Sequence, residues 1–285
     1  VLHRNTLTAI ADGAAQQVGP VLRRFELDLD DGVLALFFSE AIDTASYLDT
    51  SAISLMDTVT SDTAAEVFTF DTEYTSVVSR LNDLGVNDSV VYCAVATTDM
   101  PGLQLLTATV RTAADAYLRI TSAFTRDAVY ECNVGVLSAN PVLAIGDDDA
   151  LLPTRFTADT TRPRLVSSAL DLDSGELSLT FSEPVRVASL DPSSITLQSS
   201  AHPNGTASDE AITLSVNTTT SSSDGDTLTL TLTAGGGRDG DLDQIKIMRY
   251  LAMWPSRTYI AMLSTAVSDC ATGGDAQPLV PIPTS

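Results

Sequence analysis

The sequence has few basic residues and no long apolar run. Its 285 residues include 15 Lys and Arg against 37 Asp and Glu, which gives a formal net charge of -22. Nucleic acids and anionic membrane surfaces need a basic face, so neither is an expected partner. No apolar stretch approaches the roughly 20 residues of a membrane helix, so we expect no membrane insertion. Cations are natural counterparts of so acidic a surface, which also suits a solvated, self-repelling protein.

Histidine is scarce as well, and no catalytic motif is present. The two histidines, His3 and His202, have no counterparts in the other half of the chain. The nucleophile motif G-x-S-x-G does not occur, and no CxxC or His-containing cluster suggests zinc. The sequence names no reaction, and we expect that the protein is not an enzyme.

One stretch of the chain occurs twice. Residues 27–40 read LDLDDGVLALFFSE, and residues 170–183 read LDLDSGELSLTFSE. A repeat at this spacing predicts two units of the same architecture, a first at residues 19–161 and a second at residues 162–285. Each unit is long enough to bury a core of its own.

Residues 1–18 are too few for a domain, but they contain a partial copy. Residues 7–12 match residues 264–269, close to the end of the second unit. We expect this segment to be either the C-terminal strands of a preceding repeat or a tail that adds a strand to a neighbouring subunit's sheet. With no initiator Met and no signal segment, the chain is expected to be a piece of a longer, secreted protein.

The repeated stretch predicts a β-hairpin. Phe25, Leu27 and Leu29 alternate with polar residues before Asp31-Gly32, a dipeptide that favours tight turns. After this dipeptide, Leu34, Leu36 and Phe38 recur at every second position. Further short strands follow in each unit, with polar or Gly-containing connections. A short helix is expected between late strands at residues 100–110, capped by Asp99, and again after Asp241, where Leu242 begins an apolar stripe. The pattern predicts an all-β protein of two β-sandwich domains.

Residues 177–185 of the second unit, LSLTFSEPV, are followed by Ser189-Leu190-Asp191 and Ile195-Thr196-Leu197. This block resembles the tandem immunoglobulin-like repeats of bacterial surface-layer and adhesin proteins. Similar repeats occur in long secreted proteins of algae and other protists, including flagellar hair and cell-covering proteins. The resemblance implies a structural, extracellular module without catalytic residues. The first unit departs from the block, with Phe37 in place of Thr and Ala41-Ile42 in place of Pro-Val.

Acidic residues of the hairpins are candidate calcium ligands. Asp28 and Asp30 are two residues apart, which on a strand places both side chains on one face. Ca²⁺ takes six to eight oxygen ligands, so a third acid is needed nearby. The first expectation is a solvated acidic face that prevents edge pairing. Calcium is the alternative, with Asp147, Asp148, Asp149 and Asp159 near the junction and with six ligands at repeat positions: Asp28, Asp30, Glu40, Asp171, Asp173 and Glu183.

The three cysteines are an odd number for a chain expected to be secreted. Cys93 and Cys132 belong to one unit and are a candidate disulfide. Cys270 has no partner in the second unit and is expected to be free or bonded to another subunit. The glycosylation pattern N-x-S/T occurs at Asn87, Asn204 and Asn217, all in polar stretches between predicted strands.

The leading hypothesis is a structural repeat module of a secreted filament, coat or cell-wall protein, with other copies or repeats as partners. Between the units, residues 146–163 end in a proline and predict a short, stiff junction. One alternative is a carbohydrate-binding or adhesion module, for which the sole Trp254 is the candidate platform. A lone Trp more often packs in a core or an interface, and we expect that role first. A further alternative is an accessory domain of a wall-acting enzyme.

Overall fold

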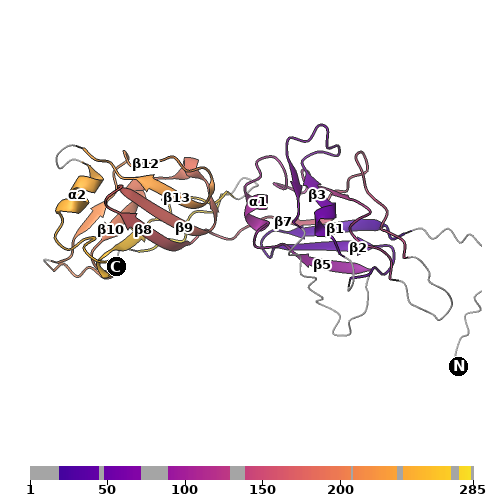
Figure 1. Ribbon diagram of the computed structural model, residues 1–285, viewed down its shortest axis with the longest axis horizontal. Helices are drawn as coiled ribbons and strands as arrows, with labels where there is room; N and C mark the ends of the chain where they lie inside the picture. The colour runs from indigo at the N-terminus through magenta and orange to yellow at the C-terminus, as the bar shows by residue number, and fades with distance from the viewer. Residues whose placement is uncertain are drawn as a thin grey trace, which may run out of the picture.

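The computed structural model describes residues 19–44, 48–71, 89–128, 139–206, 208–235, 240–270 and 276–283. These residues form a mostly β protein with several small, mainly antiparallel sheets. They divide into two units, which lie end to end along the long axis of the molecule (Figure 1). In the described part of the chain, no helix is long and apolar enough to cross a membrane.

The first unit has two sheets. One has the strand order β5-β2-β1-β7 and the other β4-β3-β6, and the short helix α1 lies between β5 and β6 in sequence. The elements are β1 Leu22–Asp28, β2 Val33–Phe38, η1 Thr50–Ala52, β3 Ile53–Met56, β4 Val67–Thr69, β5 Val90–Ala94, α1 Met100–Gln104, β6 Tyr117–Ile120 and β7 Arg155–Thr157.

The second unit repeats this plan with the orders β12-β13-β9-β8 and β11-β10-β14, and α2 occupies the place of α1. Its elements are β8 Leu165–Asp171, β9 Glu176–Val185, η2 Val187–Ser189, η3 Pro192–Ser194, β10 Ile195–Gln198, β11 Ala211–Thr213, β12 Thr219–Thr220, β13 Gly225–Thr231, α2 Asp241–Ile247, η4 Pro255–Arg257 and β14 Tyr259–Met262.

The predicted hairpins are present as β1–β2 and β8–β9. Gly32 and Gly175 occupy their turns with φ of 61° and 76°, a backbone region that glycine adopts readily. The side chain of Asp28 accepts hydrogen bonds from two backbone N–H groups of its turn, and Asp171 does the same in its own turn. Both hairpins therefore have the same turn chemistry.

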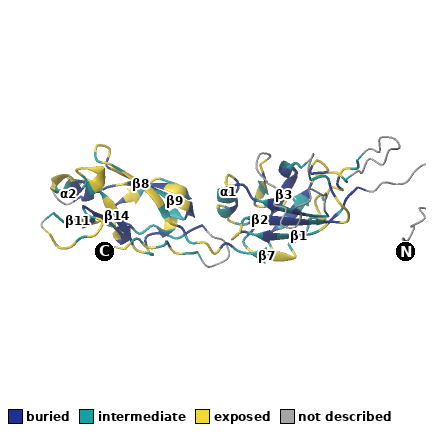
Figure 2. Cartoon of the chain, turned by 90° about the horizontal axis from the view of Figure 1, so that it is seen from below, coloured by how far each residue is buried: buried dark blue, intermediate teal, exposed yellow. Residues whose placement is uncertain are grey.

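Each pair of sheets shares one hydrophobic core. In the first unit, Leu27 and Leu36 from one sheet pack with Leu55 and Leu118 from the other, and none is more than 1% exposed. The second core draws in the same way on β9, β10, β13 and β14. Figure 2 shows the buried segments gathered separately inside each unit. The mostly β class is confirmed, and the immunoglobulin-like assignment stays a prediction.

A second shared device is an acidic side chain that holds the loop after the short helix. Glu66 accepts the consecutive backbone N–H groups of residues 107–109, and Glu210 accepts those of residues 249–251. Such bonds to an ionised acceptor are stronger than neutral ones. Part of the protein's high acid content is therefore structural.

The structure corrects several sequence-based elements. The helix predicted at residues 100–110 ends at Gln104, because Glu66 binds the next N–H groups and Val110 turns to a φ of 62°. Asp99 makes no side-chain cap; it accepts the N–H of Asp71 instead. The second predicted cap is wrong as well, since Asp241 is the first helical residue and Gly240 is the N-cap.

Two further segments, both rich in polar residues, form short strands. The Ser- and Thr-rich residues 218–226 include β12, which pairs with β13. In the predicted junction, residues 155–157 form β7, which pairs in parallel with β1. This strand forms because the outer edge of β1 offers it a backbone ladder, a cause that local sequence does not reveal.

Candidate functional site

The turn of the first hairpin holds the linker between the units. Asp30 Oδ1 accepts hydrogen bonds from Thr160 N at 3.0 Å, from Thr160 Oγ1 at 2.9 Å and from Thr161 Oγ1 at 3.1 Å. These bonds, the Thr160 N–H first among them, lower the pKa of Asp30 below its usual value. Asp30 therefore holds the linker through hydrogen bonds to an ionised carboxylate.

Gln104, the last residue of α1, connects three segments of the chain. Its Nε2 donates to Asp159 Oδ2 of the linker at 2.6 Å and to Glu183 Oε2 of β9 at 3.3 Å. Asp159 and Glu183 are only 6% and 7% exposed. The helix of the first unit is thus tied both to the linker and to the central hairpin of the second unit.

The linker is also hydrogen-bonded to the C-terminal residues 278–280 of the second unit. Arg162 donates from Nε to Pro278 O at 2.7 Å and from Nη2 to Leu279 O at 2.6 Å. One residue further on, Pro163 O accepts the N–H of Val280 at 2.9 Å. Each unit therefore holds one end of residues 159–163.

The carboxyl groups at this junction carry unusual electrostatics. Burial, followed by the negative charges of Asp159, Asp269 and Asp30, raises the pKa of Glu183 to about 8. Burial raises the pKa of Asp159 as well. Glu183 Oε1 is buried and accepts no hydrogen bond from the described residues. At neutral pH Glu183 is therefore mostly protonated, which limits repulsion between the buried acids.

The structure brings together only part of the predicted calcium set. Asp30 and Glu183 are at the junction, whereas Asp28 and Asp171 accept hydrogen bonds within their own turns. Glu40 is exposed. Asp173 is exposed too, and its backbone N–H donates to Asp171. Across the described ranges, no group of three or more His, Cys, Asp or Glu side chains is placed to hold a metal ion. The expectation that Asp28 and Asp30 project from one strand face is wrong, since β1 ends at Asp28. Calcium binding stays a prediction from the sequence.

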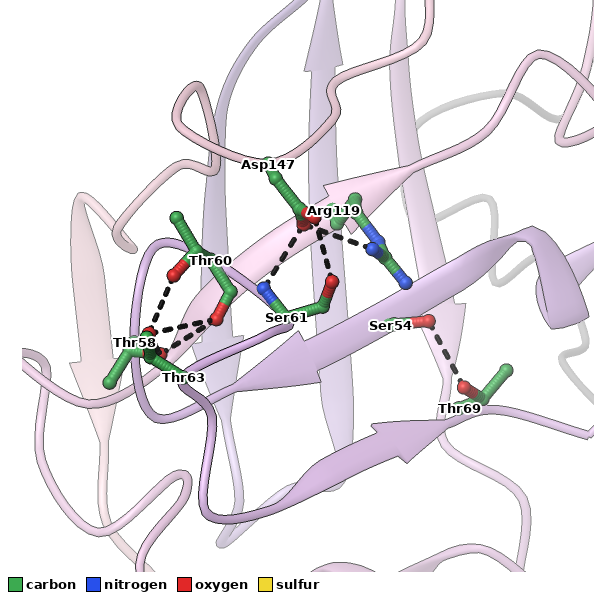
Figure 3. Close-up of polar contacts among 8 residues, drawn as sticks. All are labelled: Ser54, Thr58, Thr60, Ser61, Thr63, Thr69, Arg119 and Asp147. Carbon is green, nitrogen blue, oxygen red and sulfur yellow. Dashed lines mark hydrogen bonds and ion pairs between the residues drawn. The ribbon is translucent and has the colours of Figure 1, made fainter.

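Asp147, expected near the junction, is committed elsewhere in the first unit. It accepts hydrogen bonds from Ser61 N at 3.1 Å and Ser61 Oγ at 2.7 Å, and it forms an ion pair with Arg119 at 3.1 Å (Figure 3). Figure 3 also shows the neighbouring contact between Ser54 and Thr69, which links β3 to β4. Asp147 thus fastens the loop after β3 rather than the linker.

The described cysteines are buried and unreactive in character. Cys93 and Cys270 form no disulfide in the structure and are 1% and 5% exposed. Burial raises the pKa of Cys93 to about 12 and, as the largest cause, that of Cys270 to about 11. Cys132 lies outside the described residues, so its bond to Cys93 stays a prediction. The burial of Cys270 favours a free thiol over a bond to another subunit.

Two of the three predicted glycosylation sites can be placed. Asn204 and Asn217 are exposed in loops of the second unit, which is where a glycan is tolerated. Asn87 lies outside the described residues.

Of the two roles expected first for Trp254, packing in a core is wrong, whereas a place in an interface stays a prediction. Trp254 is 62% exposed, and it lines a groove of about 430 Å³ between β8 and β14 in the second unit. Tyr259, at 37% exposed, lines the same groove. The floor is apolar and is formed by Leu170, Leu172, Leu177, Leu197 and Ile260. The sequence signal for this site was the unpaired Trp, but the groove itself depends on how the two sheets meet.

Comparisons with protein-family models, with curated proteins and with solved structures found no match to this chain. The candidate sites are thus defined by geometry alone. Sequence reasoning missed Gln104, whose place at the end of a helix gave no sign that it would bridge two acids.

Proposed function

We propose that this chain is a structural repeat module of a secreted extracellular filament, coat or cell-wall protein, in which each unit is an immunoglobulin-like sandwich. The junction is the observation that carries the proposal. Asp30 of the first unit holds one end of the linker, and Arg162 binds the other end to Pro278 of the second unit. Such a linker suits a protein that transmits force or sets spacing. Other repeats or copies of the protein are the proposed partners.

Shared details of the two units support the structural reading. The turn acids Asp28 and Asp171 and the loop anchors Glu66 and Glu210 recur at matching places and bind backbone groups. Carboxylates that bind backbone N–H groups hold a loop in one conformation, which suits a repeat that transmits force. The exposed Asn204 and Asn217 suit a glycosylated, extracellular protein.

Small-angle X-ray scattering on the purified chain tests the stiff junction. We expect one end-to-end arrangement for the natural sequence and a broader distribution of unit separations for Asp30→Ala combined with Gln104→Ala. Asp173→Ala is the matched control, because Asp173 is the repeat counterpart of Asp30, but among the described residues its side chain accepts no hydrogen bond from the linker. A natural chain that already scatters as two freely jointed units would contradict a spacer or force-bearing role.

A second candidate function is carbohydrate binding or adhesion, and the exposed Trp254 favours it. Aromatic rings at a groove offer a flat, apolar face for stacking, and Tyr259 lines the same groove. A glycan array probed with the natural chain and with Trp254→Ala separates the two functions. Glycan signals that disappear in the variant would favour the carbohydrate function, and a blank array would remove it.

A further inference from the structure

The two units differ at one edge of the hairpin sheet. In the first unit, the outer edge of β1 is paired with β7, with Glu26 opposite Arg155, Leu27 opposite Phe156 and Asp28 opposite Thr157. In the second unit, β8 is the outermost strand of its sheet, and no described segment pairs with its outer edge. An open strand edge presents unpaired backbone donors and acceptors.

The second sheet shows the same difference. Leu118 of β6 exchanges two backbone hydrogen bonds with Leu151, of 2.8 and 3.0 Å. Its counterpart is Ile260 of β14, because Ile120 and Met262 occupy matching positions two residues later. Within the described residues, no segment bridges to Ile260 as Leu151 does to Leu118. Residues 151–157 therefore close both sheet edges of the first unit, and no described residue of the second unit does the same.

Apolar side chains at this edge of the second unit are less covered than their counterparts in the first unit. Leu27 and Leu29 are 1% and 4% exposed, whereas their counterparts Leu170 and Leu172 are only half-buried although the residue type is the same. In the first unit, Leu151 and Phe156 supply the covering side chains by packing against the core. In the second unit, the corresponding space is the groove that Trp254 lines.

We propose that this groove binds an extended segment of the residue 151–157 type, running parallel to β8. The first unit shows the hydrogen bonds to expect. Thr154 N donates to Phe25 O at 2.9 Å, and Leu29 N donates to Thr157 O at 2.9 Å. Their counterparts in the groove are Ser168 O as acceptor and Leu172 N as donor.

The chemistry of the segment fits its site. Residues 151–157 read LLPTRFT, and their Leu and Phe side chains suit a groove that is lined by Leu170, Leu172 and Ile260. Main-chain hydrogen bonds provide the affinity when a strand is added to a sheet edge, and side-chain pockets provide the specificity. The proline at position 153 precedes the strand, so it removes no bond from the ladder.

A synthetic peptide of residues 150–158, ALLPTRFTA, tests the proposal with the natural chain as receptor. Trp254 is the only Trp, so its fluorescence reports directly on the groove. We expect saturable 1:1 binding with a change in Trp254 emission. A peptide N-methylated at the Thr154 nitrogen should bind about tenfold more weakly, because it loses the bond to Ser168 O. A scrambled peptide of the same composition should not bind.

Receptor variants locate the site by anisotropy of a labelled peptide. Trp254→Ala should weaken binding about tenfold, since an aromatic wall of the groove is removed. Val216→Ala, which removes an exposed apolar side chain outside the groove, should leave binding unchanged. The proposal is overturned by absence of binding up to about 1 mM peptide or by equal binding of the scrambled peptide. Glycan binding at Trp254 without peptide binding would overturn it too. Neither result bears on whether the junction is stiff, which the scattering experiment decides separately.

Discussion

Replacing Glu183 by glutamine should remove a pH-dependent loss of stability. The pKa of Glu183 rises from an ordinary value of 4.5 to about 8 in the folded protein, first because of burial and then because of Asp159. Between these two pH values the folded state binds one more proton than the unfolded state. The free energy of unfolding therefore falls as the pH rises through this window, and the full contribution is present only below about pH 4.5.

The size of the effect follows from the two pKa values. One pKa unit corresponds to about 1.4 kcal/mol, so Glu183 costs about 3 kcal/mol by pH 7 and as much as about 5 kcal/mol by pH 8, relative to pH 4.5. Glutamine has nearly the same shape and no charge. Glu183→Gln should therefore match the natural chain at pH 4.5 and be the more stable protein by about 3 kcal/mol at pH 7.

Urea unfolding followed by Trp254 fluorescence between pH 4.5 and 8.5 measures this difference, because Trp254 reports on the second unit. Glu176→Gln is the matched control, since Glu176 lies in the same strand, β9, but is exposed. It should leave the pH profile unchanged. Parallel profiles for the natural chain and Glu183→Gln would refute the reasoning, because a buried acid among other acids must respond to its own ionisation.

Two further predictions concern the shared devices of the units. Gly175→Ala should cost about 1 to 2 kcal/mol, because φ is 76° and the new Cβ would lie 2.8 Å from Leu242 Cδ2. Gly225→Ala, whose Cβ would meet only Ser223 O at an ordinary 3.9 Å, is the control from the same unit in the same urea assay. Although burial alone would raise it, hydrogen bonds from residues 107–109 lower the pKa of Glu66 to about 2. The contribution of Glu66 to the free energy of unfolding should be present above pH 4.5 and be lost as the pH falls towards 2. Glu66→Gln should abolish this part of the loss of stability in acid. The same loss in the variant and in the natural chain would refute the anchoring role.

The hairpins could be predicted because their signal is local. Leu27 and Leu29 alternate with polar residues, and Leu34 and Leu36 recur at every second position of the partner strand. Gly32 occupies the turn between them, so the pattern and the turn chemistry agree. The strand at residues 155–157 could not be predicted, because three residues after a proline look like a linker until β1 offers an edge. The end of α1 at Gln104 depends in the same way on Glu66, which is distant in sequence.

The candidate sites depended even more on tertiary structure. Glu40 and Glu183 hold equal positions in the repeat, yet one is exposed and the other is buried against Gln104 and Asp159. Only the packing of one unit on the next distinguishes them. Trp254 was recognisable as unusual in the sequence, but the groove that it lines depends on where β8 and β14 lie in the fold.

Immunogold labelling of intact cells that produce this protein tests the central claim most directly. Antibodies raised against the purified chain should label extracellular filaments, the coat or the wall without permeabilisation, and with regular spacing if the protein is a repeat module. Labelling that appears only inside permeabilised cells would contradict the claim that the protein is an extracellular structural component.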